Sequence, residues 1–161
     1  MPLSTIDNTG LSQSQIITAV NMPTGSVIQV VQGTLAGAFN TSSTSFVSSG
    51  LTASITPQFS TSKILITVTL VDVNAPAATD WFSATTYRNS TNLAGGSGAL
   101  QNFGFLYSPG SALQSTMTWQ YLDSPATTSS TAYTVYCCVN ASTGTINANG
   151  QTSIIILKEI R

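Results

Sequence analysis

The sequence predicts an all-β protein arranged as a sandwich or barrel. Short apolar runs alternate with polar residues at a period of two, and clusters of turn-forming residues separate these runs at the spacing of such folds. No long stretch has a helical period. The 161 residues suffice for one compact domain, which needs no metal ion or disulfide to bury enough surface.

The strands expected in the first half of the chain begin with the β-branched run at Val27 to Val31 and a short run at Leu51 to Ile55. Lys63 to Val73 is the clearest strand. Its alternate residues form one fully apolar face and one face mixed with threonine, which is typical of a strand whose second face meets solvent or a subunit. The apolar face consists of Ile64, Ile66, Val68 and Leu70.

The second half continues the pattern with expected strands at Trp81 to Arg88, Met117 to Leu122 and Tyr133 to Asn140. The last strand, Ile154 to Ile160, begins apolar on both faces, which favours a central position in a sheet. The pair Asn149–Gly150 lies between apolar runs and predicts a hairpin. In all we expect about eight to ten short strands.

Residues 1–25 differ from the rest, and we treat residues 26–161 as a separate domain. The first segment is polar with one weak apolar cluster, and either a short helix capped by Ser12 or Ser14 or an extended arm fits it. It carries too little apolar surface to order itself alone. We expect it to dock on a partner through its larger apolar side chains: Ile6, Ile16, Ile17, Val20 and Met22.

The composition excludes several classes of function. Charged residues make up 6% of the chain, against about 25% in an average domain. Four basic residues cannot neutralise a run of phosphates, so we expect no nucleic-acid partner. No apolar run is long enough for a membrane span, and the N-terminus lacks a signal-peptide pattern. A net charge of −1 favours association with other copies.

The sequence offers few candidates for chemistry, and we expect no catalytic residue, metal or cofactor. Histidine is absent, so the usual general base and metal ligand are missing. The adjacent Cys137 and Cys138 would point to opposite faces of a strand, which predicts two reduced, structural thiols. Asp72, Asn74 and Asp80 flank one loop and carry oxygens that calcium prefers, but their spacing matches no calcium loop and favours turn residues.

Aromatic side chains are the best candidates for a binding surface. Most of them are expected in the core or at a subunit interface. Phe103, Phe105 and Tyr107 are spaced two apart beside a glycine-rich loop, which indicates an exposed row that could face a glycan.

Several segments resemble a family of small virion proteins of tailed bacteriophages, including cyanophages, and the likeness covers most of the chain. The segments are Met1–Asp7, Met22–Val31, Phe46–Pro57, Ser60–Ile66, Tyr121–Pro125 and Ile154–Ile160. The resemblance implies an antiparallel, jelly-roll-like β-sandwich with an extended N-terminal attachment arm, often assembled as a homotrimer. Members include head decoration (cement) proteins, head fibres and receptor-binding modules.

The function expected from these features is that of a virion structural protein, most of all a capsid decoration protein that binds the major capsid protein as a trimer. The alternative is a tail-fibre or receptor-binding tip that contacts host surface glycans. A soluble carbohydrate-binding module outside the virion is a third possibility. The expected location is the virion, assembled in the cytoplasm of a host bacterium, with no nucleic-acid or membrane partner.

Overall fold

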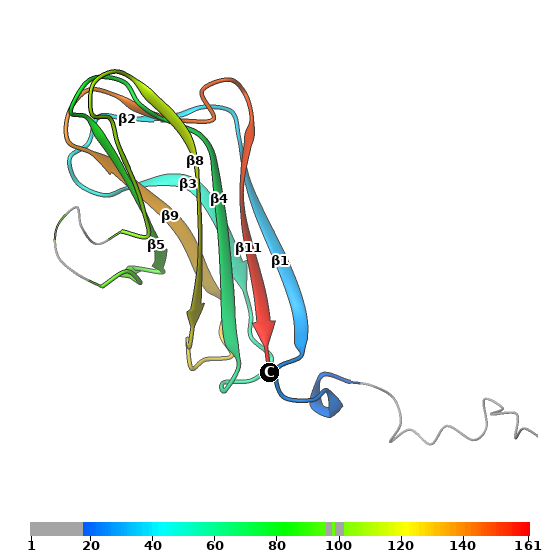
Figure 1. Ribbon diagram of the computed structural model, residues 1–161. Coiled ribbons are helices and arrows are strands. Elements are labelled where there is room, and N and C mark those ends of the chain that lie inside the picture. Colours follow the sequence, from blue (N-terminus) through cyan, green and yellow to red (C-terminus); the bar gives the residue numbers. More distant parts are fainter. Residues whose placement is uncertain (1–17, 96–97, 99–101) are drawn as a thin grey trace, which may run out of the picture.

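The protein is an antiparallel β-sandwich of two sheets, which confirms the predicted fold class (Figure 1). The computed structural model describes residues 18–95, 98 and 102–161, and over these residues the chain forms eleven strands and one short 3-10 turn. The elements are η2 (Ala19–Asn21), β1 (Val27–Ala36), β2 (Phe39–Thr41), β3 (Val47–Ile55), β4 (Lys63–Ala75), β5 (Trp81–Arg88), β6 (Thr91–Asn92), β7 (Gly104–Tyr107), β8 (Leu113–Asp123), β9 (Thr131–Val139), β10 (Gly144–Ile146) and β11 (Thr152–Ile160).

Sheet A contains β1, β11, β4 and β8 in that order, and the short strands β10 and β2 continue it beside the far end of β4. Sheet B contains β3, β9 and β5, and β7 and β6 pair with two halves of the remaining edge of β5. The start of β1 and the C-terminus lie at one end, called the lower end below (Figure 1). The last strand, β11, pairs on both sides, which confirms its predicted central position.

The core forms where the apolar faces of the two sheets meet. Strand β4 shows the predicted alternation, with one face fully buried and the other half-buried. Its alternation shifts at Asp72, which has a φ of 52° and sits in a bulge between Leu70 and Val73. Strand β9 contributes the opposite layer with Tyr133, Val135, Cys137 and Val139, all at most 1% exposed.

The hairpin predicted at Asn149–Gly150 is wrong. These residues do form a turn, in which the Gly150 nitrogen donates to the Asn147 carbonyl at 3.0 Å, but the strands on either side of the turn do not pair with each other. Strands β10 and β11 both pair with the same edge of β4. Strand β10 pairs at Asn74, and β11 pairs with the residues from Lys63 to Thr69. The turn therefore connects two strands that lie one after the other along the same edge of β4.

A buried polar bridge joins the two sheets near the lower end. Asp123 on β8 of sheet A is 5% exposed, and its two oxygens accept hydrogen bonds from Arg88 Nη1 of sheet B at 2.8 and 2.9 Å. Asp123 Oδ2 also accepts a hydrogen bond from the Tyr133 hydroxyl at 2.7 Å. Farther along β8, the Trp119 indole donates to the Thr86 hydroxyl at 3.1 Å. These contacts fix β8 against sheet B.

The bridge predicts a loss of stability at alkaline pH. Burial, and then the hydrogen bond to Asp123, raise the pKa of Tyr133 well above its ordinary value of 10.0. The unfolded chain ionises this phenol near about pH 10 while the folded chain keeps it neutral, so its contribution is complete below that pH and declines above it. Urea denaturation between about pH 8 and 11 should show a steeper decline for the wild type than for Tyr133→Phe.

Tyr107→Phe is the matched control, because Tyr107 is 48% exposed and its hydroxyl lies outside the bridge. This variant should keep the wild-type dependence on pH. Identical curves for all three proteins would contradict the role given to Tyr133.

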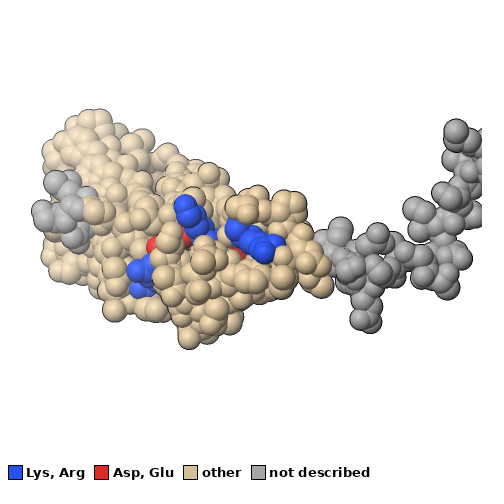
Figure 2. Space-filling view, turned by 90° about the horizontal axis from the view of Figure 1, so that it is seen from below, with Lys and Arg blue, Asp and Glu red and all other residues tan. Residues whose placement is uncertain are grey.

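The charged side chains gather at the ends of the sandwich. All four basic residues lie at the lower end: Lys63 begins β4, Arg88 ends β5, and Lys158 and Arg161 close the chain. Figure 2 shows this end, where the basic groups lie beside a few acidic ones within a mostly uncharged surface. Buried Glu159 lies here too and accepts hydrogen bonds from Gln29 Nε2 at 2.5 Å and the Gln58 nitrogen at 2.8 Å. The broad faces of both sheets are thus left nearly free of charge.

Candidate functional site

The cysteines lie in surroundings that disfavour chemistry. Both are free thiols on β9, as predicted, and both are 0% exposed. Burial raises the pKa of Cys137 well above its ordinary value of 9.0. Burial also raises the pKa of Cys138 to about 11, although a hydrogen bond with Ser83 partly lowers it. Both thiols are therefore protonated at neutral pH, and neither is a ready nucleophile.

The three oxygen-bearing residues considered for calcium have separate surroundings. Asp72 Oδ2 accepts hydrogen bonds from the backbone and side-chain nitrogens of Asn149 at 2.9 and 2.6 Å. Asn74 lies between buried Val73 and Ala75 and so faces away from the core, whereas Asp80 is buried at the turn into β5. Within residues 18–95, 98 and 102–161, no three His, Cys, Asp or Glu side chains form a group that could hold a metal ion.

The predicted docking residues of the arm fall in two groups. Ile6, Ile16 and Ile17 lie outside the described residues. Val20 belongs to η2 and is 62% exposed, the highest exposure among the large apolar side chains described. Met22 is half-buried, and its carbonyl accepts a hydrogen bond from the Arg161 guanidinium.

The last residues of the arm are attached to the sandwich. The Gly25 nitrogen donates to the Arg161 carbonyl at 2.6 Å, and the Arg161 nitrogen donates to the Ser26 carbonyl at 3.0 Å. Together with the bond to Met22, these contacts hold the segment from Met22 onward against the end of β11. Val20 is therefore presented just outside the anchored part.

The predicted aromatic row is present only in part. Phe105 and Tyr107 are 47% and 48% exposed on the outer face of β7. Phe103 instead turns toward sheet A, where its ring centroid lies 6.3 Å from that of Trp119 and 5.1 Å from that of Tyr121. This difference arises because Phe103 precedes β7 and packs against the core cluster instead of continuing the alternation of the strand.

Trp81 joins the exposed pair, and the sequence analysis did not single it out for this surface. It lies directly opposite Tyr107 across the β5–β7 ladder, and its ring centroid is 5.7 Å from that of Phe105. We call Trp81, Phe105 and Tyr107 the aromatic platform. Only the pairing register of β5 with β7 reveals this group, because Trp81 is far from Phe105 and Tyr107 in the chain.

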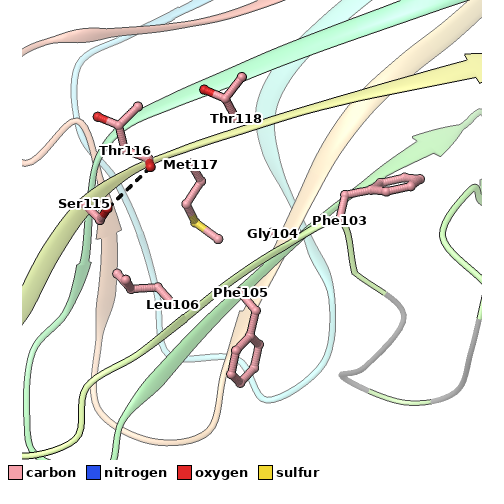
Figure 3. Close-up of a pocket in the computed structure, with 8 residues that line it drawn as sticks. All are labelled: Phe103, Gly104, Phe105, Leu106, Ser115, Thr116, Met117 and Thr118. Carbon is pink, nitrogen blue, oxygen red and sulfur yellow. Dashed lines mark hydrogen bonds between the residues drawn. The ribbon is translucent and has the colours of Figure 1, made fainter.

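A groove of about 290 Å³ lies beside β7, between the facing edges of β7 and β8. Leu106 and Met117 point toward each other across it, while the ring of Phe105 points away to the other side of β7 (Figure 3). The Ser115 hydroxyl lies on the β8 side and reaches the Thr116 carbonyl at 3.4 Å, a weak contact. The groove and the aromatic platform thus lie on either side of β7, and Phe105 belongs to the lining of both.

The outer face of sheet A is a second candidate surface, which we call the sheet-A face. Its residues form rows across β1, β11, β4 and β8, such as Gln32, Ile156, Thr67 and Gln120. The larger apolar members are Val27, Val30, Leu65, Val71, Leu122, Ile154, Ile156 and Ile160, and the polar uncharged members include Gln32, Thr34, Thr67, Thr69, Thr118 and Gln120. Its charged members are Lys63 and Lys158 and, in the bulge of β4, Asp72, whose carboxylate is paired with Asn149.

Comparison of the chain with models of known protein families found no match, and comparison with curated proteins found none either. Among the described residues, no helix has the length and apolar character needed to cross a membrane. The surfaces of the sandwich are therefore the features from which a function can be argued.

Proposed function

We propose that the protein is a structural component of a phage virion, a capsid decoration protein that binds and stabilises the head shell as a trimer. The observation that carries this proposal is the sheet-A face. A solvent-facing sheet normally carries polar and charged residues, whereas this face spans four strands with eight larger apolar side chains, and the one carboxylate on its described residues, Asp72, is paired with Asn149 in the bulge of β4. The resemblance of the sequence to small virion proteins supports the same role.

The shell is stabilised by mass action in this proposal. A protein that binds the assembled shell, and not its separated subunits, lowers the free energy of the assembled state by an amount that grows with its concentration relative to Kd. The partner is the major capsid protein, and the N-terminal arm supplies the attachment. Val20, 62% exposed beside the anchored Met22, is a contact residue on the described part of the arm.

Self-association through the sheet-A face is the first testable consequence. Light scattering of the purified protein should give three times the chain mass of 16.7 kDa. Ile156→Glu places a charge in the middle row of this face, where burial against another copy would leave it unpaired. We expect this variant to scatter light as a protein of 16.7 kDa.

Ser54→Glu is the matched control for this prediction. Ser54 is exposed on the outer face of β3 in sheet B, so the added charge lies away from the sheet-A face. This variant should keep the trimer mass. A wild-type protein that is monomeric at micromolar concentration would contradict the proposed assembly, and so would dissociation of both variants.

Binding to particles tests the virion role itself. Virions stripped of the protein are incubated with the full chain or with a chain lacking residues 1–21, and the particles are then sedimented. The shorter chain keeps the contacts of Met22 and Gly25 with Arg161, so it should fold. We expect only the full chain to sediment with the particles. Equal binding by both would place attachment on the sandwich, and no binding by the full chain would contradict the decoration role.

A second candidate, a tail-fibre or receptor-binding tip that contacts host glycans, is favoured by the exposure of Phe105 and Tyr107. The number of copies per virion separates the two functions. Hundreds of copies support the head shell, whereas a few to tens support the tail.

A further inference from the structure

The aromatic platform combines exposed rings from two neighbouring strands of sheet B. Phe105 and Tyr107 are about half exposed, and Trp81, at the start of β5, is half-buried. The rings of Trp81 and Phe105 are inclined by 31° at a centroid distance of 5.7 Å, so they pack as a tilted pair. Trp81 faces Tyr107 directly in the ladder, which extends this surface along β7.

The polar tips of this surface are available to a ligand. Within the described part of the chain, the Trp81 indole nitrogen and the Tyr107 hydroxyl take part in no hydrogen bond, whereas the buried Trp119 indole donates to Thr86. Tyrosine and tryptophan present an apolar ring and a hydrogen-bonding tip together. A ligand that suits them has an apolar face and polar groups at its rim.

The outward residues around the platform carry no charge. The outward residues of β5 and β9 next to it are Ser83, Thr85, Tyr136 and Cys138, all but Tyr136 buried. The nearest charged residues are Asp80, which precedes Trp81 and is buried, and Arg88, which turns inward to Asp123. Nothing in these surroundings would attract an anionic or cationic ligand. The ligand is therefore expected to be neutral.

The size of the platform favours a small ligand over a protein. An aromatic side chain presents roughly 150–250 Å², so two that are about half exposed and a third, Trp81, that is less exposed offer at most roughly 300 Å² in total. A stable protein interface needs about 800 Å² on each partner. A pyranose ring has an apolar C–H face that stacks on aromatic rings and a rim of hydroxyl groups that pair with indole and phenol tips.

We propose that Trp81, Phe105 and Tyr107 bind a neutral carbohydrate by stacking. This site is separate from the sheet-A face, because it lies on the other sheet, and it deepens the second candidate function, the glycan-contacting tip, on which its biological role rests. It also defines the contact more narrowly than the row expected from the sequence, since Trp81 enters it and Phe103 does not.

The test uses the full chain with nitrogen-15 in its two tryptophan indoles, observed by NMR during titration with maltohexaose, cellohexaose and chitohexaose. We expect at least one of these sugars to shift the Trp81 signal saturably while the buried Trp119 signal stays in place. Phe105→Ala combined with Tyr107→Ala should weaken the affinity about tenfold or more. Leu113→Ala, which truncates an apolar side chain 38% exposed outside the platform, should leave it unchanged.

Three results would overturn the proposal. The first is that none of the neutral sugars moves the Trp81 signal, or that only an acidic sugar such as oligogalacturonate does. The second is that the double variant binds sugar as well as the wild type. The third is that the double variant changes the mass found by light scattering, which would assign the platform to contacts between copies.

Discussion

Replacing Asp123 by asparagine is expected to lower the free energy of unfolding by about 2 kcal/mol or more, because the change removes the buried partner of an ion pair whose arginine side chain is 28% exposed. The carboxylate is 5% exposed and accepts hydrogen bonds from both Arg88 and Tyr133. Asparagine keeps the shape but not the charge, so the partly buried guanidinium loses its counterion. Urea denaturation at pH 7 measures the loss.

Asp72→Asn is the matched control for Asp123→Asn. Asp72 also accepts two hydrogen bonds, both from Asn149, but these lie at the surface. Asparagine tolerates the positive φ of this position, and the expected cost is below about 1 kcal/mol. Equal losses for the two variants would show that the bridge contributes no more than a surface contact.

A combined variant separates the bridge from simple packing. Arg88→Met, Asp123→Leu and Tyr133→Phe together replace all three polar groups by apolar ones of similar size. Because a buried ion pair replaced as a whole often costs little, the triple variant should recover most of the stability lost by Asp123→Asn alone. If it stays as unstable as the single variant, lost packing explains the effect of Asp123 instead.

Local patterns predicted the strands well where a strand has one buried face. The alternation from Ile64 to Leu70 identified β4 because each inward residue meets the opposite sheet and each outward one does not. The start of β8 was missed for the same reason. Leu113 to Thr116 are all exposed, so they show no alternation, and pairing with the end of β4 alone makes them a strand.

Contacts between sheets could not be predicted from the sequence. Asp123 lies 35 residues from Arg88 in the chain, and no local pattern connects them. The same holds for Trp81 and Phe105, which meet only through the register of β5 with β7. The hairpin at Asn149–Gly150 failed because a turn signal specifies local backbone geometry but not which strand the following segment will join.

Gly33 lies where the edge strands of the two sheets approach each other, on the side of the sandwich opposite the Arg88–Asp123–Tyr133 bridge. It lies in β1, the edge strand of sheet A, and approaches β3, the edge strand of sheet B. A Cβ atom at this position would lie 2.0 Å from the Thr52 carbonyl oxygen and 2.9 Å from Ile155 Cγ2. Its φ does not require glycine, so the close approach of two backbones is the reason for this residue.

Gly33→Ala is therefore expected to destabilise the protein by about 3 kcal/mol or more, at the upper end of the range for overpacked positions. The atom that it meets belongs to the backbone of Thr52, so β1 must move away from β3, and the ladder from β1 to β11 must move with it. Gly110→Ala is the control, since a Cβ there has no neighbour within 4 Å, and it should change the stability by less than about 1 kcal/mol. Thermal and urea denaturation of both variants measure the difference. If Gly33→Ala is as stable as Gly110→Ala, the edges of the two sheets separate at little cost, and the Arg88–Asp123–Tyr133 bridge is left as the main contact that holds the sheets in register.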